Sequence, residues 1–130
     1  MSSKIYQTLI FLIGMVSCER YTELDRFNKI VHDHYHWTYN GIIVEKYLDE
    51  KDHNRHIIIL KNNDGRDRRD FTFQSLNLFN FLKVGDSISK DRKSIDLVIK
   101  RHELDTVITL DFGNIKGWEI YSSDNPYISK

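Results

Sequence analysis

The sequence predicts a mainly β domain: a small, twisted antiparallel sheet, partly closed into a barrel or folded as a compact sandwich, with one or two short helices. Three observations support this prediction. The chain has 130 residues, a length that usually forms one domain. From residue 42 onward, apolar residues occur in short β-branched or alternating runs, which are typical of strands. Clusters of Gly, Asn and Asp separate several of these runs, as turns do.

The charge and composition of the chain exclude several classes of protein. Its 19 basic and 19 acidic side chains give a formal net charge of zero, whereas nucleic-acid binding requires an excess of Lys and Arg. Six glycines and one proline exclude collagen-like and low-complexity sequences. No Gly-x-Ser-x-Gly elbow and no phosphate-binding glycine loop occurs in the sequence. We therefore expect a binding protein and not an enzyme, with no cofactor and no nucleic-acid partner.

The first eighteen residues differ from the rest of the chain. Lys4 is the only charged residue before Glu19, and an apolar core runs from Leu9 to Val16. A membrane-spanning helix needs about 20 apolar residues, so this core is too short to span a membrane. A basic start followed by a short apolar core is typical of a secretory signal peptide. We expect residues 1–17 to be a signal peptide that is cleaved.

Met15, Val16 and Ser17 lead directly into Cys18, the only cysteine in the chain. This segment resembles the lipobox of bacterial lipoproteins, in which aliphatic and small residues precede the lipidated cysteine, although Met15 stands where leucine is usual. The resemblance covers residues 1–18 and implies a small bacterial lipoprotein with acyl chains on Cys18, since several such chains anchor a protein stably. The alternative is a buried core segment followed by a cysteine that acts as a small apolar side chain.

Residues 18–38 are expected to hold the lipidated cysteine and then a tether or a short helix. Apolar side chains recur there at spacings of three and four: Tyr21, Leu24, Phe27, Ile30 or Val31, and Tyr35. This spacing forms one face of a helix. Polar residues after a lipidated cysteine also serve as a flexible spacer, which is the alternative. The β-rich domain is expected over residues 39–130.

The first half of that domain contains two β-branched runs. Ile42–Val44 and Ile57–Leu60 are expected to form strands that are buried on both faces or closed into a barrel. Asn62–Gly65 is the clearest turn signal in the chain. It predicts a hairpin in which Phe71 and Phe73 alternate on the strand beyond the turn.

The second half of the domain adds a short helix and further strands. Ser75 is the predicted N-cap of one or two helical turns. Alternation of apolar and polar residues predicts strands over residues 95–100 and 107–112, and Trp118 with Ile120 predicts a last short strand. Five or six strands with one inserted helix predict a barrel of OB or SH3-like size, or a compact sandwich.

Three histidines are the strongest candidates for chemistry. If His32, His34 and His36 lie in a strand, all three imidazoles face one side and form a set suited to zinc or copper. In a helix, only His32 and His36 share a face, so a third ligand must come from another histidine. The candidates for that ligand are His53, His56 and His102. The alternative is a polar junction of half-exposed histidines between helix and sheet.

Two clusters of basic residues are interrupted by aspartates. The first cluster is Arg66, Arg68 and Arg69, and the second is Lys90, Arg92 and Lys93. On an OB-like sheet with exposed aromatic residues, such clusters bind single-stranded nucleic acid. Because acids lie between the basic residues, we instead expect charged hairpin tips that keep the strand edges soluble.

The sequence as a whole predicts a lipid-anchored protein of the bacterial cell envelope, at the outer membrane or facing the periplasm, that acts as a binding or structural module. Its expected partners are the membrane, through Cys18, and another envelope protein or a surface component. Aromatic side chains commonly anchor such partners, and the candidates are Trp37, Tyr39, Tyr47 and Trp118. The second prediction is a metal-binding envelope lipoprotein that uses His32, His34 and His36.

Overall fold

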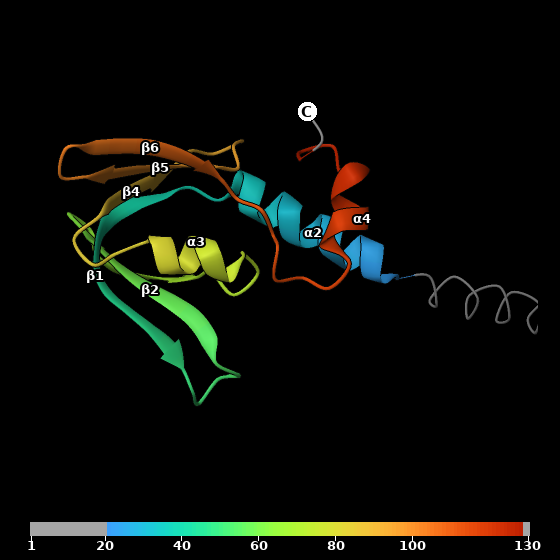
Figure 1. Ribbon diagram of the computed structural model, residues 1–130, viewed down its shortest axis with the longest axis horizontal. Coiled ribbons are helices and arrows are strands. Elements are labelled where there is room, and N and C mark those ends of the chain that lie inside the picture. The colour runs from blue at the N-terminus through green and yellow to red at the C-terminus, as the bar shows by residue number, and fades with distance from the viewer. Residues whose placement is uncertain (1–20, 129–130) are drawn as a thin grey trace, which may run out of the picture.

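The computed structural model describes residues 21–128 and shows a bent sheet with helices packed against it (Figure 1). The described strands are β1 (Tyr39–Asp49), β2 (Arg55–Asn62), β3 (Gly65–Asp70), β4 (Ser87–Lys90), β5 (Asp96–Arg101) and β6 (Leu104–Thr109). The described helices are α2 (Glu23–His36), α3 (Leu76–Phe81) and α4 (Trp118–Ser123). The strands form one antiparallel sheet in the order β3-β2-β1-β4-β5-β6.

The mainly β prediction is confirmed, but the predicted barrel is wrong, because the sheet is open. Within residues 21–128, the edge strands β3 and β6 lie at opposite ends of the strand order and do not pair with each other. The single described sheet also lacks the second layer of a sandwich. Side chains of α2 and α3 share one core with β1, β2, β4 and β5. In Figure 1, α3 lies on the inner side of the bend of the sheet.

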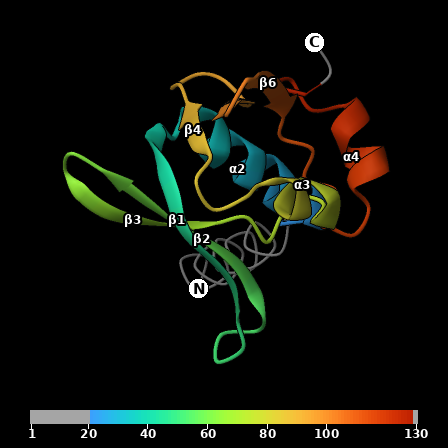
Figure 2. The ribbon, with the colours of Figure 1, turned by 60° about the vertical axis from the view of Figure 1, so that its left-hand side comes forward.

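β1 is the central strand and joins the two halves of the sheet (Figure 2). Its N-terminal residues pair with β4, and most of the remainder pairs with β2. The register with β2 shifts between Ile43 and Glu45, and such a β-bulge bends a strand. Gly41 precedes the bulge with φ +150°, and a Cβ atom there would lie 2.8 Å from the carbonyl oxygen of Lys61. A glycine is required at this close approach.

α2 confirms the predicted short helix. Thr22 is its N-cap and forms a capping box with Asp25, in which each side chain binds the other residue's backbone N–H. Phe27 is 1% exposed and Val31 is fully buried, and both lie in the same core as the strands. The helix is therefore packed on the sheet and does not form a flexible tether.

The hairpin predicted at Asn62–Gly65 is confirmed as the β2–β3 turn. β3 ends at Asp70, so the prediction that Phe71 and Phe73 lie on the strand is wrong. After Gly65, the strand consists of Arg and Asp residues, and it lies at the edge of the sheet. Charged side chains are usual on edge strands because they prevent pairing with other chains.

The later strand and α3 are placed nearly as predicted. Ser75 caps α3, since its hydroxyl accepts a hydrogen bond from the backbone N–H of Leu78 at 3.2 Å. The strand expected over residues 107–112 begins earlier, at Leu104, and ends at Thr109. A tight turn returns the chain onto β5, where Arg101 pairs with Leu104. Because of this turn, backbone pairing with β5 already begins at Leu104, before the start at residue 107 that the alternation predicts.

The prediction of a last strand at Trp118–Ile120 is wrong, because this segment begins α4. The helix starts after Gly117, whose φ of +88° is left-handed, and the backbone N–H of Tyr121 donates to the carbonyl of Gly117 at 3.1 Å. The ring of Tyr121 packs 5.5 Å from the ring of Phe27 in α2. A single apolar–polar–apolar repeat fits a strand or a helix, and packing on α2 favours the helix.

An ion pair holds the turn between α3 and β4. Asp86 is 2% exposed and accepts two hydrogen bonds of 2.8 Å from Nε and Nη2 of Arg101 in β5. Its Oδ2 also accepts from the backbone N–H of Lys83, and Arg101 donates to the carbonyl of Phe81 at 2.6 Å. The hydrogen bonds from Arg101 hold the pKa of Asp86 below its usual value. The pair stays charged at neutral pH and ties α3 to β5.

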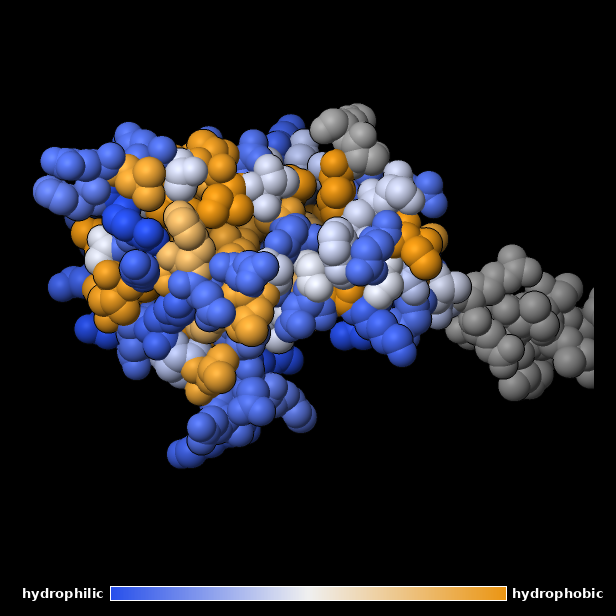
Figure 3. Space-filling view, in the orientation of Figure 1, coloured by the Kyte–Doolittle hydropathy of each residue, from blue (hydrophilic) through white to orange (hydrophobic). Residues whose placement is uncertain are grey.

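The surface of the domain is hydrophilic at the tip of the β1–β2 hairpin, which projects from the body of the domain (Figure 3). The tip includes the charged and polar residues 50–54. In Figure 3, apolar side chains gather instead over the body of the domain. No helix within residues 21–128 is long and apolar enough to cross a membrane.

Candidate functional site

A cavity of about 160 Å³ lies between the C-terminal end of α2, the start of β1, the end of β3 and the loop that precedes α3. Its apolar and aromatic walls are Trp37, Tyr39, Phe71 and Leu110. Its buried polar residues are His34 and Gln74, and its rim consists of the exposed Arg68 and the partly exposed Arg69 and Asp70. We call it the Gln74 cavity. An apolar protein cavity of about 150 Å³ holds one benzene molecule, so this one has room for a single ring.

Gln74 is 1% exposed and has a fixed orientation. Its Oε1 accepts hydrogen bonds from the backbone N–H groups of Asp111 at 2.9 Å and Phe112 at 3.0 Å. Since both partners are donors, the amide oxygen faces them and Nε2 faces away. Nε2 is buried and has no hydrogen-bond partner among the described residues. A buried donor without a partner costs about 1–3 kcal/mol.

His34 is 6% exposed and packs against aromatic rings. Its ring lies 4.6 Å from Trp37 and 5.4 Å from Phe112, measured between ring centroids. Burial, together with the nearby charge of Lys90, lowers the pKa of His34 to about 4. The imidazole is therefore neutral at pH 7, and it places no positive charge in the cavity.

Lys90 is buried beside this site, which corrects the expectation that it lies on an exposed hairpin tip. It is 1% exposed, and its Nζ donates to the backbone carbonyls of Tyr35, Trp37 and Asp91. Burial lowers the pKa of Lys90 to about 8. The carbonyls of Tyr35 and Trp37 lie at the C-terminal end of α2, where a cation compensates the helix dipole. The ammonium thus fixes the chain where α2 passes into β1.

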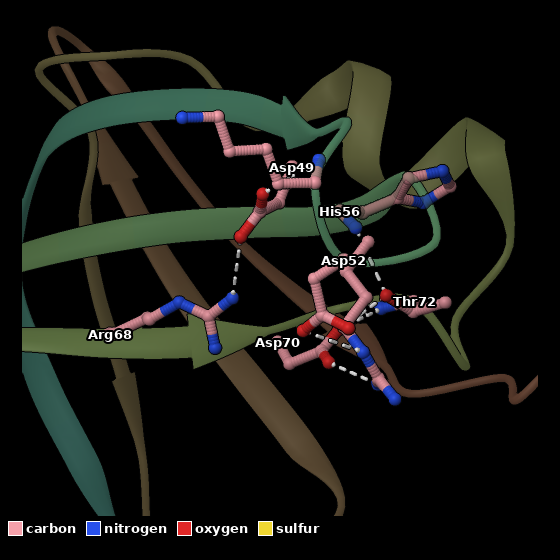
Figure 4. Close-up of polar contacts among 8 residues, drawn as sticks. Asp49, Asp52, His56, Arg68, Asp70 and Thr72 are labelled. Carbon is pink, nitrogen blue, oxygen red and sulfur yellow. Dashed lines mark hydrogen bonds and ion pairs between the residues drawn. The ribbon is translucent and has the colours of Figure 1, made fainter.

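The charged residues at the rim already have partners (Figure 4). Asp70 accepts hydrogen bonds from Arg55 at 2.8 Å and from the backbone N–H and hydroxyl of Thr72. Arg68 donates to Asp49 at 3.3 Å. These contacts join β1, β2 and β3 and fix the rim in place.

Arg69, the remaining charged residue at the rim, is also held. Its Nη2 lies 2.8 Å from the carboxylate of Asp67, and its guanidinium lies 4.7 Å from the centroid of the Tyr39 ring. The stacked guanidinium orders the ring that forms one wall. The charges at the rim are therefore paired, and Gln74 is a lining residue with a buried atom that has no hydrogen-bond partner among the described residues.

Other hollows lack such a group. Two further cavities, of about 200 and 330 Å³, lie beside the start of α2 and beside the β2–β3 turn. Among the residues described for them, none carries a buried polar atom without a partner. The Gln74 cavity is for this reason the candidate functional site.

The structure separates the three histidines proposed as metal ligands. His32 and His36 share one face of α2 with their ring centroids 4.4 Å apart, and Nδ1 of His32 lies 3.0 Å from the hydroxyl of Tyr127. His34 lies on the opposite, buried face. His56, one candidate for a further ligand, stacks on Phe79 instead. Within residues 21–128, no three His, Cys, Asp or Glu side chains are grouped so that they could hold a metal ion.

The four aromatic residues proposed as anchors have different surroundings. Trp37 is 45% exposed and borders the Gln74 cavity, whereas Tyr39 is buried in the core and forms a cavity wall. Tyr47 and Trp118 are half-buried. Trp37 is therefore the anchor candidate with both an exposed face and a cavity beside it.

The signal peptide predicted for residues 1–17 and the lipidation site at Cys18 lie outside the described residues. No protein-family model matches the chain, and no curated protein and no solved structure shows significant similarity to it. The residues of the chain itself are therefore the basis for inferring its function.

Proposed function

We propose that this chain is a lipid-anchored protein of the bacterial cell envelope whose folded domain binds a ligand group in the Gln74 cavity and performs no catalysis. The anchor is argued from the lipobox-like segment from Met15 to Cys18. One observation carries the binding role. The cavity has room for a single ring between aromatic walls, and Trp37, which lines it, is 45% exposed.

The surroundings of the cavity favour binding. Pockets that bind small groups are mostly apolar, with a few fixed polar groups that orient the ligand. Here Phe71 and Leu110 supply apolar surface, and the hydrogen bonds to Asp111 and Phe112 fix the amide of Gln74. Trp37 is exposed beside the opening, and tryptophan is enriched among residues that dominate binding energy. The bound group would be part of another envelope protein or of a surface component.

The anchor predicts a specific difference between the wild type and Cys18→Ser. We expect wild-type protein from membrane fractions to begin at Cys18 and to carry the added mass of acyl chains, because the thiol is the site of lipid attachment. Cys18→Ser should lack that mass and leave the membrane fraction or remain unprocessed. Intact-mass analysis of both fractions measures this. Ser17→Ala keeps a small residue before the cysteine and should be acylated like the wild type. Unmodified wild-type protein that begins at Met1 would refute the anchor.

The binding role predicts that single-ring compounds perturb the cavity. We expect at least one compound of a single-ring set to shift the backbone amide resonances of His34 and Phe71 in the full-length protein. Trp37→Ala should weaken that binding about fivefold, because an aromatic contact contributes about 0.5–1.5 kcal/mol. Tyr21→Ala, which removes an exposed ring outside the cavity, should leave the affinity unchanged. If no compound shifts these resonances, the cavity is not a binding site.

A further inference from the structure

We propose that the edge strand β6 is an interface at which two copies of this chain pair antiparallel, about a two-fold axis at Val107. This inference goes beyond the proposed function, because β6 does not line the Gln74 cavity. It depends on three features of the edge: the backbone groups that point away from β5, the small number of charges on the strand, and the order of its residues, which suits a second copy of the same strand.

The outer edge of β6 carries backbone groups that no neighbouring strand pairs. The N–H of Leu110 donates to the carbonyl of Ile95 at 2.8 Å, so these two residues form a hydrogen-bonded pair. Such pairs alternate along an antiparallel ladder, and the register with β5 then directs the N–H and C=O groups of Asp105, Val107 and Thr109 away from β5. Among the described residues, these outward groups have no hydrogen-bond partner. They are therefore available to another strand.

The two edges of the sheet differ in the side chains that they carry. β3, at the other edge, consists of Arg and Asp residues after Gly65, and such charges keep an edge strand from pairing. β6 has a single charged residue, Asp105, and its Leu104 and Val107 are 42% and 58% exposed. In Figure 1, this strand lies along the top of the domain. An edge with exposed apolar side chains and one charge is suited to pairing with another chain.

The order of residues in β6 selects a second copy as that chain. The outward residues are spaced evenly about Val107, so a two-fold axis there pairs Val107 with its own copy and Asp105 with Thr109 in both directions. Each of these three pairs then exchanges two backbone hydrogen bonds. The carboxylate of Asp105 faces an uncharged threonine, so no like charges are opposed. Val107 already pairs with Val98 in its own sheet, and the axis therefore brings four valines into one row across the junction.

Pairing of β6 with the opposite edge of a second copy is less favourable. It would place Val107 beside the charged side chains of β3, where Arg68 already pairs with Asp49 and Arg69 with Asp67. A head-to-tail contact of this kind also leaves a free edge on each new copy and continues into a filament, whereas the contact of β6 with β6 is closed. The geometry therefore favours a dimer.

Hydrogen exchange in the wild-type, full-length protein tests the interface directly. We expect the amides of Asp105, Val107 and Thr109 to exchange about tenfold more slowly in concentrated than in dilute solution, because pairing protects N–H groups from water. The outward amides of β3, at the charged edge, are the internal control and should exchange equally fast at both concentrations. Sedimentation velocity should show a dimer forming over the same range of concentration.

Val107→Lys tests the position of the axis. It places two ammonium groups side by side, and directly opposed like charges destabilise a strand pair. We expect the dissociation constant of the dimer to rise about tenfold. Val84→Lys is the matched control, because Val84 is 61% exposed and lies between α3 and β4, outside β6. It should leave the dissociation constant unchanged.

Three results would overturn this inference. The first is a chain that stays monomeric with fast exchange along β6, which would leave the edge for a strand of another protein. The second is slow exchange along β6 at every concentration, which would mean that a segment of the same chain covers the edge. The third is a dimer that Val107→Lys does not weaken, which would place the interface elsewhere. If Val107→Lys does not fold, the concentration dependence of exchange in the wild type decides.

Discussion

Replacement of Phe27 by alanine is expected to lower the free energy of unfolding by about 3–5 kcal/mol. Phe27 is 1% exposed, and its ring packs 6.2 Å from that of Phe112 and 5.5 Å from that of Tyr121. Truncation of a buried phenylalanine removes its apolar contacts and leaves a cavity, and both effects lower stability. Chemical denaturation of wild type and variant measures the difference.

This prediction tests whether α2 belongs to the folded domain. Leu24→Ala is the matched control, because Leu24 lies in the same helix and is 37% exposed. Its effect should stay within about 1 kcal/mol, since substitutions at exposed positions usually change stability little. Equal small effects of both variants would mean that α2 is a tether outside the core. Such a result would also remove His34 and Trp37 from the Gln74 cavity.

The second large effect is a loss of stability of about 3 kcal/mol as the pH falls from 6.5 to 4. Burial lowers the pKa of His34 to about 4 in the folded protein, whereas the unfolded chain has the ordinary value of about 6.5. Between these values the unfolded state binds a proton that the folded state does not, so acidification favours unfolding. The stabilising effect of the neutral imidazole is complete above pH 6.5 and is lost as the pH falls to 4.

Denaturation at several pH values between 7 and 4 measures this effect as the difference between wild type and His34→Leu. The variant has no imidazole at this position, so its stability should fall less over the same range, and carboxylates account for what remains. His32→Gln is the control, because it removes a histidine from the opposite face of α2. It should retain the steep dependence of the wild type. A slope of His34→Leu equal to that of the wild type would contradict the burial of a neutral His34.

The candidate site was accessible to sequence reasoning only in part. The sequence draws attention to His34, Trp37 and Tyr39, but as a metal ligand and as partner anchors. Helical spacing already separates His34 from His32 and His36, once the segment is known to be a helix. In β4, Ile88 and Lys90 lie on the same buried face of the sheet, contrary to the prediction that places Lys90 on a hairpin tip.

Gln74 had no comparable signal. It follows Phe71 and Phe73, and the strand pattern predicted for that segment does not mark it as a buried or functional residue. Its role depends on hydrogen bonds to Asp111 and Phe112, which lie 37 and 38 residues further along the chain. A contact over such a distance leaves no periodic pattern in the residues around it. The cavity itself has the same origin, because its lining comes from residues 34–39, 68–74 and 110.

The sequence by itself determined the elements whose cause is local. Thr22 and Ser75 cap their helices through neighbouring backbone N–H groups, Asn62–Gly65 forms a turn within the hairpin, and β-branched runs form the inner strands. Only the tertiary structure decided that the sheet stays open, that Trp118–Ser123 is a helix and that Gln74 borders a cavity with an unpaired donor. Each of these results depends on contacts between segments far apart in the chain, where packing outweighs local preference.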